Sequence, residues 1–140
     1  MSASESNPDR LSLTVRGASA VAEAVGAARS VGEARGLENQ QLARLCVVIE
    51  ELIANLYDHG GVTADDEVEL SFATAAGGVR VSIIAPGMPF DPWSSVPGSS
   101  SPRGGRAGVN LIRAWSELVS YQPTSGANRL EILIPLTRGS

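Results

Sequence analysis

The feature that most constrains the fold of this chain is a long amphipathic stretch from Glu38 to about His59. Its apolar residues recur every three or four positions, which is the spacing of one face of an α-helix. Gly60 and Gly61 follow at once and end the helix. A continuous apolar face has to be buried, so the rest of the chain must supply a layer to cover it. The face consists of Leu42, Leu45, Ile49, Leu52, Ile53 and Leu56.

The segment before this helix predicts one strand and one further helix. Residues 11–15 alternate between apolar and polar side chains, which is the two-residue period of a half-buried strand. The alanine-rich run from about Ser19 to Arg35 has apolar residues at helical spacing, and Gly36 stands where a C-terminal cap belongs. We expect residues 1–9 to be a disordered leader and residues 10–140 to form one domain.

The segment after the long helix predicts the remaining strands. Residues 67–72 and 79–84 alternate on either side of a glycine-containing turn and predict an antiparallel hairpin. Helical spacing returns over residues 108–118, and residues 128–136 predict a last strand. The expected fold class is α+β, a two-layer sandwich with helices packed on one face of a mixed, mainly antiparallel sheet. The alternation in the strands predicts that the other sheet face is open to solvent.

Composition excludes several classes of function for these 140 residues. A net charge of −4 disfavours direct nucleic-acid binding, and all 11 basic residues are arginine, so a P-loop lysine is absent. No apolar run is long enough to span a bilayer, and residues 1–8 are polar where a signal peptide would be basic and then apolar, so we expect a cytoplasmic protein without membrane contact. The single cysteine, Cys46, is expected to pack as a small buried hydrophobe.

Three polar residues of the long helix are spaced four positions apart: Glu51, Asn55 and His59. That spacing aligns their side chains along one edge of the helix, beside the apolar face. One interpretation is a solvated helix edge with a contact between the Glu and Asn side chains. The other is a row of functional groups that face a cleft.

The same helix resembles a known family, the anti-sigma-factor serine kinases within the histidine-kinase-like ATPases (GHKL or Bergerat fold). The family pattern is E-x-x-x-N-x-x-x-H-G, and this chain has Glu51-Leu-Ile-Ala-Asn55-Leu-Tyr-Asp-His59-Gly60. The resemblance implies that Glu51 is the catalytic general base and that Asn55 binds the magnesium held by the ATP phosphates. It also places His59 among the nucleotide-binding residues. A carboxylate suits proton acceptance, and magnesium prefers hard oxygen ligands.

A second family pattern, D-x-G-x-P-F-D-P, is matched by residues 85–92 except at its first position, where this chain has Ala85. In the family this position holds an aspartate whose carboxylate accepts a hydrogen bond from the adenine amine. The resemblance implies that Gly87 and Phe90 contribute to the nucleotide site. Ala85 offers no acceptor there, and an unpaired buried donor weakens binding by about 1 to 3 kcal/mol.

A third family pattern, G-G-x-G-L-x-L-I, aligns with residues 105–112. Gly105 and Gly108 are retained, and Arg106 replaces the middle glycine. Backbone N–H groups at a glycine turn that enters a helix form an anion site, so these three residues are candidate phosphate contacts. An ordinary flexible connection is the alternative interpretation of this segment.

The resemblance covers nearly the whole chain and implies a function. It implies an anti-sigma-factor-like regulator: a serine/threonine protein kinase that uses ATP and magnesium to phosphorylate an anti-anti-sigma protein of the STAS type. The same protein would sequester a sigma factor and form a homodimer. The alternative is a degenerate partner-switch module of this fold that binds nucleotide weakly or not at all, as Ala85 and Arg106 suggest.

Overall fold

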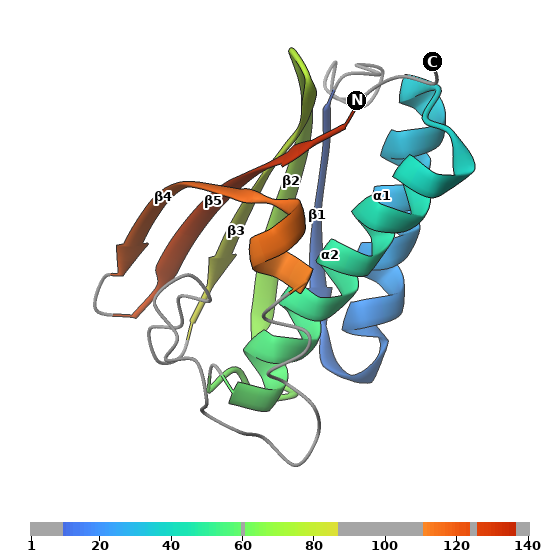
Figure 1. Ribbon diagram of the computed structural model, residues 1–140. Coiled ribbons are helices and arrows are strands. Elements are labelled where there is room, and N and C mark those ends of the chain that lie inside the picture. The colour runs from blue at the N-terminus through green and yellow to red at the C-terminus, as the bar shows by residue number, and fades with distance from the viewer. Residues whose placement is uncertain (1–9, 60, 87–110, 124–125, 137–140) are drawn as a thin grey trace, which may run out of the picture.

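The computed structural model describes residues 10–59, 61–86, 111–123 and 126–136 of the chain. A short helical segment over residues 111–115 precedes the fourth strand (Figure 1). The elements, in chain order, are β1 (Arg10–Arg16), η2 (Gly17–Ser19), α1 (Ala20–Arg35), α2 (Asn39–His59), β2 (Glu67–Ala75), β3 (Gly78–Ala85), β4 (Glu117–Pro123) and β5 (Asn128–Pro135).

The strands form one sheet with the order β1-β2-β3-β5-β4. Every strand pairing among the described residues is antiparallel. Figure 1 shows both long helices on the same side of this sheet, which confirms the expected two-layer α+β architecture. The hairpin expected after the long helix is β2–β3, with Ala75 opposite Gly78 at its turn.

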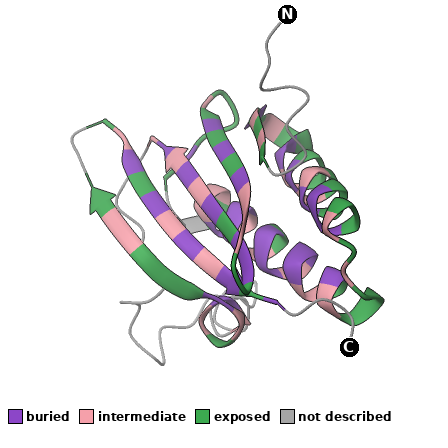
Figure 2. Ribbon diagram, turned by 90° about the horizontal axis from the view of Figure 1, so that it is seen from above, coloured by how far each residue is buried: buried purple, intermediate pink, exposed green. Residues whose placement is uncertain are grey.

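Burial along the strands alternates between the two faces of the sheet (Figure 2). In β2, Val68, Leu70 and Phe72 are buried while the residues between them are exposed. The other face is open and polar, as expected, and carries a shallow groove of about 280 Å³. An ion pair crosses that face, with Arg80 Nη1 2.7 Å from Glu131 Oε2.

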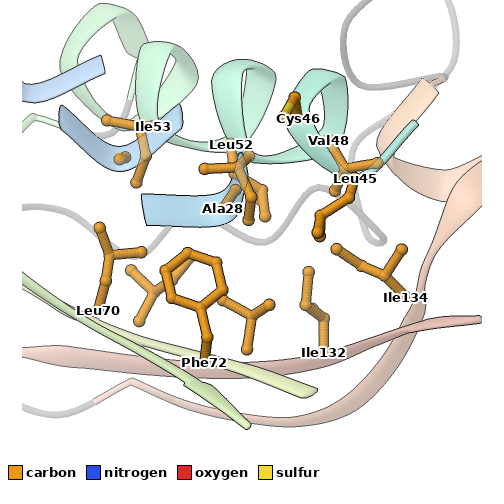
Figure 3. Packing of buried hydrophobic residues seen from close by; sticks show 14 of the residues in the cluster. Ala28, Leu45, Cys46, Val48, Leu52, Ile53, Leu70, Phe72, Ile132 and Ile134 are labelled. Atoms are coloured by element: carbon orange, nitrogen blue, oxygen red, sulfur yellow. The ribbon is translucent and has the colours of Figure 1, made fainter. Parts of the chain in front are cut away.

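The apolar face of α2 packs on the inner face of the sheet (Figure 3). Phe72 lies between the layers and is fully buried, as are Leu45 and Ile53 of α2. Cys46 is buried and carries a free thiol, so the expectation of a small buried hydrophobe is confirmed. Within the part of the chain that the structure describes, no helix has the length and apolarity needed to cross a membrane.

The two glycines inside α1 lie in opposite environments, and they give a matched test of the packing between α1 and α2. A Cβ atom at Gly26 would meet nothing within 4 Å, whereas one at Gly32 would overlap Cδ1 of Leu42. We therefore expect Gly26→Ala to raise the free energy of unfolding by about 0.5–1 kcal/mol, because alanine favours helix over glycine. Gly32→Ala should lower it by about 1–3 kcal/mol through overpacking.

Urea denaturation of the two glycine variants measures both effects, and each variant is the control for the other. An equal gain in stability from Gly32→Ala would contradict the close approach of α1 to α2 at Leu42.

The helix expected over residues 108–118 is shorter at its C-terminal end than the sequence pattern predicted. Helical structure ends at residue 115, and Glu117 already begins β4. Leu118 and Val119 extend the helical spacing but lie in the strand, 37% and 43% exposed. A shift of register between Leu118 and Ser120 marks a β-bulge at this point. The apolar residues at helical spacing therefore continue past the end of the helix into β4, an edge strand whose side chains are little buried.

Candidate functional site

Asn55 is a buried polar residue in the C-terminal half of α2. It is only 4% exposed, and its neighbours Leu52 and Ile53 belong to the apolar core. An amide at this depth needs hydrogen-bond partners, because burying an unpaired polar group is costly. The arrangement differs from the solvated helix edge that was the alternative interpretation of this row of residues.

The helix itself supplies one partner for Asn55. Nδ2 of Asn55 donates to the main-chain carbonyl of Glu51, one turn earlier, at 2.6 Å. The Asn55 side chain therefore contacts the main chain of Glu51, and the Glu51 carboxylate takes no part in this hydrogen bond. It also orients the amide, because the bonded nitrogen makes Oδ1 the atom left for a ligand. A carbonyl oxygen of this kind is the hard donor that magnesium prefers.

Glu51 is partly buried and lies among other acidic residues. Burial raises the pKa of its carboxyl above the ordinary value of 4.5, and the nearby carboxylates Glu50 and Asp58 raise it further. Both causes disfavour the charged form of the side chain. A raised pKa brings a carboxylate closer to the range in which it is an effective general base.

The raised pKa of Glu51 predicts a pH-dependent gain in stability for Glu51→Gln. Because the folded-state pKa exceeds the unfolded value, the stability associated with the protonated carboxyl is lost as the pH rises through the folded pKa. We therefore expect the glutamine variant to melt at a higher temperature than the native protein at pH 7.5. The difference should shrink as the pH falls toward 4.5.

Circular dichroism melts at several pH values measure this difference. Glu69→Gln is the matched control, since it removes the same charge from an exposed position on the open face of the sheet. A constant difference in melting temperature between Glu51→Gln and the native protein at all pH values would contradict the expectation.

The inner face of the sheet contributes a second set of residues at the same end of the molecule. Figure 1 shows the last turns of α2, the end of β3 and the beginning of β5 at this end. Ala85, the last residue of β3, is 2% exposed and faces the helix layer with the buried residues of its strand. Its partner across the sheet is Asn128, the first residue of β5, which is 8% exposed.

Asn128 begins the last strand and was not among the site residues predicted from the sequence. The signal that places Asn128 beside Ala85 is the pairing of β3 with β5, which joins residues far apart in the chain. The structure therefore places the buried amide of Asn128 opposite the buried methyl group of Ala85 at this end of the sheet.

The other site residues expected from the sequence lie outside the residues that the structure describes. His59 ends α2, but its side chain is outside the described part of the structure. Residues 1–9, the expected disordered leader, also lie outside the described residues. The remaining candidates outside the described residues are Gly87, Phe90, Gly105, Arg106 and Gly108.

The helical segment over residues 111–115 is held against the core and α2. Ile112 is fully buried, and the hydroxyl of Ser116 donates to its main-chain carbonyl. The guanidinium of Arg44, on α2, lies over the ring of Trp115 with 5.1 Å between the Cζ atom and the ring centroid. This cation–π contact joins the segment to α2 at a distance where the attraction is effective.

Comparisons with known proteins agree with this architecture. The sequence family described as "Histidine kinase-like ATPase domain" matches residues 14–134. A similar solved structure is described as the histidine kinase domain from Erythrobacter litoralis EL346 blue-light activated histidine kinase, with 17% sequence identity and a TM-score of 0.51. The match covers 84% of this chain and 60% of that chain, and at this identity it shows the fold alone. A search of curated protein sequences gave no significant match.

Proposed function

Since this chain belongs to the histidine kinase-like ATPase domain family, we propose that it is a magnesium- and ATP-dependent protein kinase that regulates transcription as an anti-sigma factor. Its proposed substrate is a serine of an anti-anti-sigma protein of the STAS type. In the absence of that partner it would sequester a sigma factor, with a homodimer as its working form. The family supports the ATPase fold, and the motif on α2 supports the kinase activity.

The observation that carries this proposal is the buried amide of Asn55 one turn from the Glu51 carboxylate. Asn55 is 4% exposed, and its nitrogen is bonded to the helix backbone at 2.6 Å. A helix that needed only to pack on the sheet would favour an apolar residue at this position. A carboxylate with a raised pKa and an oriented amide oxygen on the same side of a helix instead suit phosphoryl transfer.

In the proposed reaction, the Glu51 carboxylate accepts the proton of the substrate serine hydroxyl as the serine oxygen attacks the γ-phosphorus of ATP. The bond between the γ-phosphorus and the bridging oxygen breaks, and ADP leaves with that electron pair. The carbonyl oxygen of Asn55 would hold magnesium, which neutralises phosphate charge when bound. Phosphoryl transfer depends mainly on such positioning and charge neutralisation.

Ala85 favours a second candidate function, a partner-switch module of the same fold without phosphoryl transfer. Ala85 is 2% exposed, and its methyl group offers no acceptor to an adenine amine. The loss of one such hydrogen bond weakens binding by roughly five- to 150-fold. In this second candidate the protein would exchange partners through its surface alone.

Calorimetric titration with magnesium-ATP, followed by phosphate transfer to a purified STAS protein, distinguishes the two functions. Micromolar binding by the native protein and labelling of a serine on the STAS protein would support the kinase. Undetectable binding that Ala85→Asp restores would support the partner-switch module and overturn the kinase. Labelling without a requirement for magnesium would also contradict the proposed role of Asn55.

A further inference from the structure

The open face of the sheet has no covering layer among the described residues, because both long helices lie on the other face (Figure 1). We propose that a second copy of this chain packs on the open face, sheet against sheet, about a two-fold axis parallel to β3. β3 is the central strand, so this axis places β2 over β5 of the second copy and β1 over its β4. The inference rests on the homodimer in the proposed function and assigns that dimer a surface.

The charges on the open face fall into two groups. Nη1 of Arg80 is 2.7 Å from Oε2 of Glu131, and Nη1 of Arg16 is 3.9 Å from Oε2 of Glu67, so these side chains form ion pairs within the chain. The other charged residues of this face form no ion pair with any residue that the structure describes. A partner on this face would have to match them. These unpaired charges are Arg10, Glu69, Glu117 and Arg129.

Strand register places two of the unpaired charges on either side of the central strand. Glu69 of β2 pairs with Ile84 of β3, and Ile84 pairs with Arg129 of β5. A two-fold rotation about an axis parallel to β3 exchanges the two flanking positions and keeps the row. Glu69 therefore faces Arg129 of the second copy, and Arg129 faces Glu69 of the second copy. The two copies of Ile84 meet at the axis, as an isologous contact requires.

The other two unpaired charges lie at the two edges of the sheet, in one row. The register runs from Arg10 on β1 through Ala73, Arg80 and Leu133 to Glu117 on β4. The same rotation exchanges the edges, so Arg10 faces Glu117 of the second copy. Ala73 faces Leu133 of the second copy and adds an apolar contact. Arg80 lies at the axis, where its carboxylate partner 2.7 Å away offsets the like charge of the second Arg80.

The lengths of these side chains fit the spacing of two packed sheets. Sheets that pack face to face lie about 10 Å apart, with their strands aligned to within about 30°. An arginine from one copy and a glutamate from the other span that gap, whereas Ser71 and Ser82 are too short to meet across it. These serines line the groove, which would remain between the sheets. One symmetry operation therefore gives every unpaired charge a partner of opposite sign, which is the self-complementarity of an isologous interface.

Charge reversal at the contact between Glu69 and Arg129 tests the interface, with analytical ultracentrifugation of the full chain as the measurement. The contact occurs twice in the dimer, so one substitution brings like charges together at two places. We expect Glu69→Arg, and separately Arg129→Glu, to raise the dimer dissociation constant about 100-fold or more. The double variant Glu69→Arg/Arg129→Glu restores opposite charges and should regain the native dissociation constant.

Glu33→Arg is the matched control, because Glu33 is exposed on α1, in the helix layer. It reverses the same charge away from the open face, so it should keep the native dissociation constant. Arg10→Glu and its rescue by Glu117→Arg repeat the test in the other row of the sheet. That second pair decides the question if a variant at Glu69 or Arg129 fails to fold, which circular dichroism would show.

The other outcomes separate this inference from the kinase proposal. A native dimer that both reversals leave unchanged would place the dimer contact elsewhere and overturn the inference, as would a double variant that is folded yet monomeric. A native protein that stays monomeric would overturn the interface and the homodimer together, whereas magnesium-ATP binding and phosphate transfer, measured separately, decide the kinase. Loss of STAS binding in the reversal variants without a change in the dimer would assign the face to that partner and overturn the inference.

Discussion

In the proposed kinase reaction, phosphate transfer to the proposed STAS substrate is expected to fall by a factor of about 10²–10⁴ in Glu51→Gln, which is the usual contribution of a positioned general base. Glutamine keeps the size of the side chain but cannot accept the serine proton. Magnesium-ATP affinity should change little, because the proposed magnesium ligand, Asn55, is bonded to the main chain of residue 51 and not to its carboxylate. The remaining rate should lose the dependence on pH that ionisation of Glu51 gives the proposed reaction of the native protein.

Radiolabelling of the STAS protein under single-turnover conditions measures this rate, and calorimetry measures the affinity. Glu50→Gln is the matched control, because Glu50 is the exposed neighbour of Glu51 and raises its pKa. The control should keep the native rate at neutral pH while its pH profile moves to lower pH. A Glu51→Gln enzyme that retains the native rate would show that another group accepts the proton.

Unfolding free energy is expected to fall by about 3–5 kcal/mol in Phe72→Ala, the range for removal of a buried aromatic side chain. Phe72 is fully buried and lies between the sheet and the helices (Figure 3). It pairs with Leu11 of β1 on one side and with Val81 of β3 on the other. The loss is large because the rigid sheet around the ring cannot close the cavity.

Guanidinium denaturation followed by circular dichroism measures the loss in Phe72→Ala. Ser71→Ala is the matched control, because Ser71 is the adjacent residue on the open face and its hydroxyl makes an exposed contact of 3.2 Å with the hydroxyl of Ser12. This control should change stability by less than about 0.5 kcal/mol. Similar losses in the two variants would contradict the assignment of Phe72 to the core and of Ser71 to the open face.

The main elements of the fold were predictable from the sequence because each has a strong local pattern. The apolar face of α2 repeats over many turns, and the structure buries Leu45, Ile49 and Leu52 from it. The glycine that follows α1 takes the left-handed conformation, with a φ of 81° at Gly36, as a C-terminal cap requires. The two strands of the hairpin alternate clearly because one of their faces is buried and the other is open.

β4 was not predicted, because an edge strand is weakly patterned. Its residues are exposed or only partly buried, so neither face imposes an alternation. Leu118 and Val119 extend the helical spacing of the segment before it, and the bulge between Leu118 and Ser120 breaks the two-residue period. Only pairing with β5 identifies residues 117–123 as a strand.

Sequence alone therefore determined the helices, the hairpin, the expected α+β class and the polar pair Glu51 and Asn55, since these depend on neighbours within a few residues. Tertiary structure decided that Asn55 is buried, because its exposure depends on the layer packed against α2. It also decided that Ala85 faces Asn128, because strand register is set by contacts between distant segments. The sequence alone shows that residue 85 is alanine and not an acid, whereas only the strand pairing shows that the amide of Asn128 lies opposite it.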